Sequence, residues 1–201
     1  MSKRIALLSA VAFSALALTA SVIAPASAED KKMPKSELSG EKTVMVGGAA
    51  MFPSKNIIQN AVNSKDHTTL VAAVKAAGLV DTLQGTGPFT VFAPTNDAFA
   101  KLPAGAVDNL LKPENKGTLT KVLTYHVVPG RLSSADLRKE IKAGNGSATL
   151  KTVAGGTLWA SMKGNDIMLK DEKRGWAKIT QANVFQSNGV IHVIDTVVMP
   201  Q

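Results

Sequence analysis

The segment from Phe89 to Pro103 constrains the fold most, because it combines a buried strand with an immediate turn into a helix. In 89–93, apolar residues occupy both alternating sets of positions, a pattern typical of a strand that is buried on both faces. Pro94 lacks the N–H that a sheet ladder requires and is predicted to end the strand. Thr95 is a good helix N-cap, and Asp97 in the first turn complements the helix dipole. We therefore expect an interior strand followed at once by a capped helix.

The first 28 residues carry the features of an export signal. Lys3 and Arg4 form a basic start, an apolar run follows at 5–23, and Ala26-Ser27-Ala28 is a small-residue cleavage pattern. We expect cleavage before Glu29 rather than retention of this segment as a membrane anchor. The protein is therefore predicted to be secreted or periplasmic, with no stable membrane insertion after cleavage.

Composition limits the chemistry of the remaining chain. Residues 29–50 are polar and rich in lysine, which predicts a flexible arm, and 51–201 is long enough for a single domain with one core. The absence of cysteine removes thiol catalysis and leaves packing alone to stabilise an exported domain. The formal net charge of +8 favours anionic partners, but the charges are scattered and aromatic residues are few. We therefore expect a monomer that does not bind nucleic acid.

The hydrophobic period changes near the middle of the chain. Before about residue 144, apolar residues recur mostly at helical spacing, and after it short strand-like segments alternate with glycine-containing turns. This order predicts an α+β domain rather than a series of βαβ units, with the 89–94 strand inside the sheet of the later strands. The predicted strands after the change are 150–153, 157–162, 166–170, 177–184 and 190–199.

Three blocks of the sequence carry a family resemblance. The blocks are Thr90-Val-Phe-Ala-Pro-Thr-Asn-Asp-Ala-Phe99, Leu123-Thr-Tyr-His-Val-Val-Pro-Gly130 and Asn188-Gly-Val-Ile-His-Val-Ile-Asp195. In this order and spacing they resemble the fasciclin (FAS1) domain family, and most of all its single-domain exported bacterial members. The resemblance implies a β-sandwich or wedge with helices packed along one side. The signature positions within the blocks are Thr90, Phe92, Pro94, Thr95, Asp97, Asn188, Gly189 and His192.

Tyr125 and His126 are two candidate binding residues, because in the resembling family this dipeptide is linked to integrin-type adhesion. A second interpretation follows from the residues alone, since His126 lies on the apolar face of a predicted helix. It is then a buried neutral imidazole that donates to a backbone carbonyl and fixes the exit of the chain from the helix. Animal members also carry an acidic short motif before the third block, and 181–185 contains no acid. Integrin recognition through that segment is therefore not expected.

Trp176 is the third candidate binding residue. It follows the basic turn Lys173-Arg174-Gly175, where an exposed ring would stack on a sugar or join an interface, whereas a buried ring would cover the sheet edge.

Asn188-Gly189 predicts a hairpin turn, and His192 is interpreted as a packed strand residue. The histidines are not at metal-ligand spacing and the chain has no Gly-x-Ser-x-Gly elbow. We therefore expect no catalytic, metal or cofactor site.

Two functions remain open at this point. The resemblance implies a non-enzymatic adhesion protein that binds a cell-surface or matrix component, either protein or polysaccharide, and in bacteria associates with a host. The alternative is a carrier or sensor of a small apolar ligand, which an empty apolar cavity on the order of several hundred Å³ would favour. A close-packed core with an exposed patch at Tyr125, Trp159 or Trp176 would favour surface binding instead.

Overall fold

The computed structural model describes residues 42–201, so the predicted signal peptide at 1–28 and most of the predicted arm lie outside the described residues. The last part of that arm forms a hairpin of β1 (Val44–Val46) and β2 (Ala49–Met51). Its turn is Gly47-Gly48, and both glycines have positive φ angles, which glycine adopts without steric cost. The folded part therefore begins before the predicted boundary at Met51.

The order of the other elements follows the predicted change of period, and the domain is α+β. Helices dominate up to residue 143, and strands follow from residue 147. The short strand β4 was absent from the sequence prediction, because three residues directly after a helix carry too little pattern. The elements are α1 (Ile57–Ala61), α2 (Thr68–Ala77), α3 (Val80–Gln84), β3 (Phe89–Pro94), α4 (Asn96–Ala100), α5 (Ala106–Leu111), α6 (Lys116–Tyr125), β4 (Val127–Pro129), α7 (Ser134–Ala143), β5 (Ser147–Lys151), β6 (Thr157–Lys163), β7 (Asp166–Lys170), β8 (Trp176–Gln186) and β9 (Gly189–Ile194), with short 3₁₀ helices at Lys65–His67 and Pro113–Asn115.

Seven strands form one mixed sheet in the order β4-β3-β9-β8-β7-β6-β5. The strand β3 pairs antiparallel with β4 and parallel with β9, so it has a partner on each edge, as predicted. The hairpin of β8 and β9 is also confirmed, but its turn residues are Ser187 and Asn188, because Gln186 already pairs with Gly189. Gly189 lies in the strand, where a Cβ would collide with the carbonyl oxygen of Phe89. Glycine is required there by the close approach of β3.

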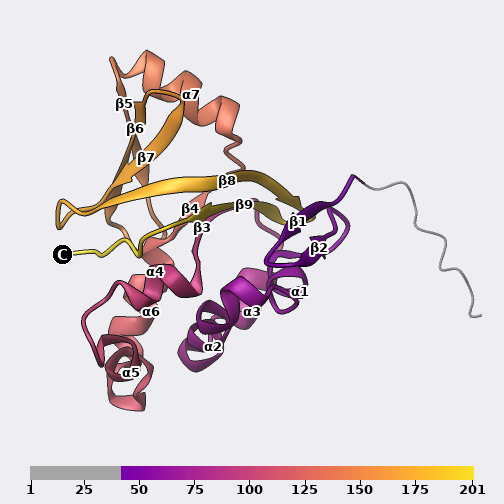
Figure 1. The fold of residues 1–201 in the computed structure, drawn as a ribbon, viewed down its shortest axis with the longest axis vertical. Helices are drawn as coiled ribbons and strands as arrows, with labels where there is room; N and C mark the ends of the chain where they lie inside the picture. The colour runs from indigo at the N-terminus through magenta and orange to yellow at the C-terminus, as the bar shows by residue number, and fades with distance from the viewer. Residues whose placement is uncertain (1–41) are drawn as a thin grey trace, which may run out of the picture. The chain divides into compact units, whose positions relative to one another are not determined.

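Two apolar cores lie on the two sides of the sheet. In β3, Val91 belongs to the core under α1–α6, and its neighbour Phe92 belongs to the core under α7, which confirms a strand buried on both faces. Figure 1 shows α7 along β5–β7 and the other helices gathered on the far side of β9. The fold is thus a wedge in which α7 covers the inner face of β5–β8 and leaves their outer face uncovered.

Local capping signals are confirmed. The Thr95 side chain accepts a hydrogen bond from the Ala98 N–H at 3.2 Å, and Asp97 lies in the first turn of α4. The predicted strand at 190–199, in contrast, ends at Ile194. At this end the Asp195 N–H still donates to the Lys178 carbonyl at 3.2 Å, but the Lys178 N–H is accepted by the Asp195 carboxylate at 2.8 Å in place of a backbone carbonyl. Within residues 42–201, no helix is long and apolar enough to cross a membrane.

Candidate functional site

Tyr125, at the end of α6, is fully buried. Its hydroxyl donates to the Thr157 carbonyl at 2.6 Å and accepts the Glu172 N–H at 3.2 Å. A Cβ at Gly156 would come within 2.7 Å of the ring, so the tyrosine packs directly on that backbone. Burial raises the pKa of Tyr125 to about 12. The side chain therefore connects α6 to the end of the sheet and is not presented to a macromolecular partner.

His126 is also buried, and both of its ring nitrogens are bonded. Nδ1 donates to the Val122 carbonyl at 2.8 Å, and Nε2 accepts the Val198 N–H at 3.2 Å. Burial lowers the pKa of His126 to about 4, so the ring is neutral near pH 7. These contacts agree with the interpretation of His126 as a core residue that fixes the end of the helix. A contact role at the surface requires an exposure that this ring lacks.

The buried signature residues Thr90 and His192 hold one connecting segment against the sheet. The Thr90 hydroxyl donates to the Gly130 carbonyl at 2.7 Å and accepts the Leu132 N–H at 2.9 Å. His192 Nε2 donates to the Leu132 carbonyl at 2.8 Å, and its Nδ1 accepts the Asn183 N–H at 3.4 Å. Both residues therefore fix the path from β4 to α7. Their role is architectural.

Asn188, in the turn before β9, also holds neighbouring segments against the sheet through its side chain. Its side chain accepts the Ile57 N–H at 3.0 Å and donates to the Leu83 carbonyl at 2.7 Å, which joins α1 and α3 to the β8–β9 turn. Asn60 in α1 is fully buried and donates to the side chain of Gln186. This pair is not predicted from the sequence, because an asparagine beside Gln59 and a glutamine beside Ser187 are typical of solvent-facing positions. Their burial follows from the packing of α1 against the end of β8.

Trp176 lies on the uncovered outer face of the sheet and is 49% exposed. Lys170 is opposite Trp159 on one side and opposite Trp176 on the other, so these three residues form a row across β6, β7 and β8. The Lys170 ammonium lies 5.7 Å from the centre of the Trp176 ring, within cation–π range. A shallow depression of about 350 Å³ is lined by this Trp159–Trp176 row together with Ser147 and Ser161.

The exposure of the row follows from strand alternation. Leu158 and Leu169 point inward to the core under α7 and are fully buried, so their neighbours Trp159 and Lys170 point outward. Lys178 also lies on this outer face and pairs with Asp166 at 2.7 Å. The remaining outward lysines of β5–β7 are Lys151, Lys163 and Lys170. The face combines two indole rings, hydroxyl groups and an excess of positive charge, and groups of these kinds are able to bind an anionic partner.

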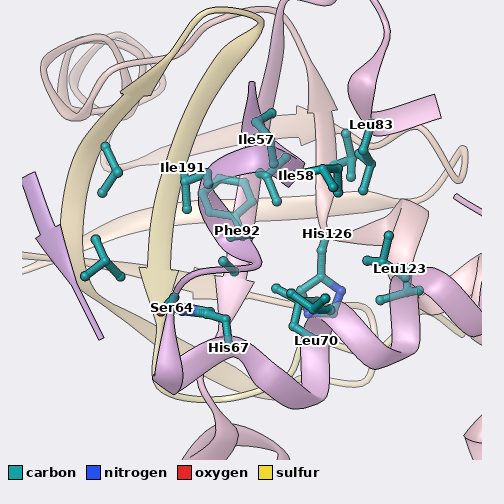
Figure 2. A pocket seen from close by; sticks show the side chains of 18 of the residues that line it. Ile57, Ile58, Ser64, His67, Leu70, Leu83, Phe92, Leu123, His126 and Ile191 are labelled. Atoms are coloured by element: carbon teal, nitrogen blue, oxygen red, sulfur yellow. Dashed lines mark hydrogen bonds between the residues drawn. The ribbon is translucent and has the colours of Figure 1, made fainter. Parts of the chain in front are cut away.

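A second feature is an apolar cavity between α1, α2, α3 and the sheet, shown in Figure 2. Its volume is about 50 Å³, well below the several hundred Å³ that a carrier of lipid-sized ligands requires. His126 and His67 both reach its wall. Among the residues that the structure describes, no three metal-ligating side chains come together.

The comparison with known protein families decides the identity of the fold. The Fasciclin domain model matches residues 65–200, which is more than half of the chain. The chain belongs to the fasciclin family. The signature blocks of this fasciclin protein therefore correspond to β3 with α4, the end of α6 with β4, and β9.

Relatives of this fasciclin protein occur in several bacteria. Protein sll1483 from Synechocystis is 46% identical over 160 residues, which cover 80% of this chain and 82% of that protein. The cell surface glycolipoprotein MPB83 from Mycobacterium bovis is 35% identical over 160 residues, which cover 77% of this chain and 64% of that protein. Among solved structures, a FAS1 domain pair from the insect cell adhesion molecule Fasciclin I aligns with a TM-score of 0.65 at 19% identity. The alignment covers 73% of this chain and 51% of that pair, and establishes the shared fold.

Proposed function

We propose that this fasciclin protein is an exported, non-enzymatic adhesion protein that binds an acidic polysaccharide of a cell surface or matrix. The outer face of β5–β8 is the proposed binding surface. The Trp159–Trp176 row with Lys170 between its rings is the observation that carries the proposal. Membership in the fasciclin family and the cell-surface relative MPB83 support a surface role. The formal net charge of +8, which becomes +6 when Lys3 and Arg4 are removed with the predicted signal (8 − 2), favours an anionic partner.

The chemistry of the row fits a sugar chain. Trp159 and Trp176 are two strand spacings apart, about 10 Å, so each ring is able to stack on a different unit of one polysaccharide. Lys170 lies between them in the strand register, with its ammonium beside the Trp176 ring, and would pair with a carboxylate or sulfate group. The hydroxyls of Ser147 and Ser161 line the same depression and would bond to sugar hydroxyls.

The burial of the other two candidate residues, Tyr125 and His126, supports the outer sheet face as the binding surface. Tyr125 is 0% exposed and His126 is 2% exposed, so a partner that used them would first have to open the core. Trp176 requires no such rearrangement. We therefore attribute adhesion to the outer sheet face and a structural role to the Tyr125-His126 pair.

A binding comparison tests the proposal. Wild type, Trp176→Ala and Lys170→Gln are titrated against polygalacturonate, chondroitin sulfate and neutral dextran, with a thermal melt of each variant. We expect Trp176→Ala to weaken binding of the acidic polymers at least tenfold without lowering the melting temperature, because central tryptophans dominate binding energies. Lys170→Gln should weaken binding mainly at low salt, since salt screens an exposed charge. Dextran should bind more weakly than either acidic polymer.

Phe185→Ala is the matched control, because Phe185 is 39% exposed on β8 but lies outside the row. It should leave polysaccharide affinity within twofold of wild type. Equal losses for Phe185→Ala and Trp176→Ala would contradict a defined site on this face. Turnover of an ester or peptide substrate by the purified protein would contradict the non-enzymatic part of the proposal.

A further inference from the structure

The outward lysines of β5–β8 differ in whether an acidic group of the protein lies near them. The Lys178 ammonium pairs with the Asp166 carboxylate at 2.7 Å, and Lys163 is opposite the same aspartate in the β6–β7 register. Lys170 has no carboxylate within ion-pair distance in the part of the chain that the structure describes. Its ammonium lies instead beside the Trp176 ring, 5.7 Å from the ring centre.

Lys151, on the edge strand β5, also has an acidic neighbour. Its ammonium donates to the Thr157 hydroxyl at 3.0 Å. The Glu172 carboxylate accepts the N–H groups of Gln201 and Thr157, which lower the pKa of this carboxyl, and the charge of Lys151 lowers it further. Lys170 is therefore the outward lysine of these strands whose charge the protein itself neutralises least. Such a cation is available to pair with an anionic group of a ligand.

The strand register places Lys170 midway between the two indole rings. Trp159, Lys170 and Trp176 are successive partners across β6, β7 and β8, so neighbours in this row are one strand spacing apart, about 4.8 Å. A pyranose unit lengthens an extended polysaccharide by about 5 Å, which is close to that spacing. A sugar chain that lies across the strands therefore places one unit at Trp159, the next at Lys170 and the third at Trp176.

The three positions favour sugar units of different charge. The face of an indole ring carries partial negative charge, so it stacks well on the C–H groups of a neutral sugar and poorly against a carboxylate or sulfate. The ammonium of Lys170, in contrast, favours an anionic group. Because the other outward lysines have acidic neighbours, an acid on a stacked unit gains less than an acid at Lys170.

We propose that Lys170 determines which charge pattern the outer face recognises, namely one acidic sugar with a neutral sugar on each side. The partner is then a polysaccharide in which acidic and neutral units alternate, and not one that carries an acid on every unit. This inference rests on the proposed polysaccharide-binding function. It adds the direction of the sugar chain, across the strands, and the register of its charges on the Trp159–Trp176 row.

Two trisaccharides built from the same two sugars test the register. Glucuronate between two N-acetylglucosamine units has one acid, which lies at Lys170 when both indoles are occupied. N-acetylglucosamine between two glucuronates has two acids but places a neutral unit there. Each is titrated into the purified protein at physiological salt, and the indole N–H signals of Trp159 and Trp176 are followed by NMR. We expect the first to bind at least fivefold more tightly despite its smaller charge, because it alone combines two stacked units with a charge-assisted hydrogen bond.

Two variants assign the preference to one side chain. Lys170→Gln should weaken the first trisaccharide at least fivefold and bring the two trisaccharides within twofold of each other. Arg174→Gln is the matched control, because Arg174 is an exposed cation in the turn before β8 and lies outside the row, and it should leave the preference unchanged. Thermal melts show whether each variant is folded, and the comparison of the two trisaccharides on wild type depends on neither variant.

The proposal is overturned if wild type binds the two trisaccharides equally or binds neither, or if folded Lys170→Gln keeps the preference. It is also overturned if Arg174→Gln, and not Lys170→Gln, removes the preference. These outcomes leave the proposed function intact as long as Trp176→Ala still weakens the binding of chondroitin sulfate. Loss of that effect of Trp176→Ala contradicts the proposed function itself.

Discussion

Removal of the Tyr125 hydroxyl tests whether Tyr125 stabilises the core or contacts a binding partner. Tyr125→Phe keeps the ring and deletes the atom that donates to the Thr157 carbonyl at 2.6 Å and accepts the Glu172 N–H at 3.2 Å. A typical intramolecular hydrogen bond contributes about 0.5–1.5 kcal/mol, and a buried partner left unpaired costs about 1–3 kcal/mol. We therefore expect the free energy of unfolding to fall by about 2–3 kcal/mol. For a domain of this size the melting temperature should decrease by about 4–12 °C.

The assay is urea unfolding of wild type and Tyr125→Phe, followed by circular dichroism, with the slope against urea unchanged. Thr124→Ala is the neighbouring control, because its hydroxyl donates only within α6, to the Thr120 carbonyl at 2.7 Å and the Lys121 carbonyl at 3.2 Å, and it should cost less than about 0.5 kcal/mol. Polysaccharide affinity of Tyr125→Phe, measured well below its melting temperature, should equal that of wild type. A variant of wild-type stability that lost binding would refute the reasoning, because it would make Tyr125 a contact residue.

Two more perturbations follow from burial and close contact. Burial lowers the pKa values of His67, His126 and His192, for His126 to about 4, so protons bind the unfolded chain first. The free energy of unfolding should be highest above about pH 6.5 and should fall as the pH decreases below it. For His126 the decline should extend to about pH 4, at about 1.4 kcal/mol per pH unit, in melts across pH. A flat profile would contradict neutral buried rings. Gly189→Ala should cost about 1–3 kcal/mol or more in urea unfolding, because its Cβ meets the β3 backbone. Gly117→Ala, with open space at a helical position, should be neutral or stabilising by up to about 1 kcal/mol, and equal effects at the two glycines would argue against the close approach.

The elements that were predicted well are those whose signals are local. Thr95 caps α4 through the N–H three residues later, as predicted. The glycine-containing turns separate β6, β7 and β8 close to the predicted bounds, whereas β5 begins three residues before its predicted start and β9 ends five residues before its predicted end. In each case the interacting groups lie within a few residues of one another, so the chain carries the evidence in one short window.

The elements that were missed depend on partners far along the chain. β4 is a strand because Val127–Pro129 meets Phe89–Val91 across the sheet. The buried Asn60 bonds locally to the backbone of Phe52, but it also donates to Gln186, 126 residues later, and nothing near Asn60 in the sequence indicates that contact. Gly189 was predicted as a turn residue but lies in β9. Glycine is required there because a Cβ would meet the backbone of the neighbouring strand β3, which is far away in the sequence.

For the candidate site, too, some features were predicted from the sequence and others depend on the tertiary structure. The sequence alone identified an α+β chain of fasciclin type, pointed to Trp176 beside a basic turn, and left Tyr125-His126 open between core and contact. The tertiary structure buries both residues, which supports the core interpretation, and sheet register places Trp159 and Lys170 in one row with Trp176. Caps, turns and periodicity are set by neighbours in the chain. Exposure and the assembly of a surface depend on which strands pair and which face α7 covers, and only the folded chain settles these.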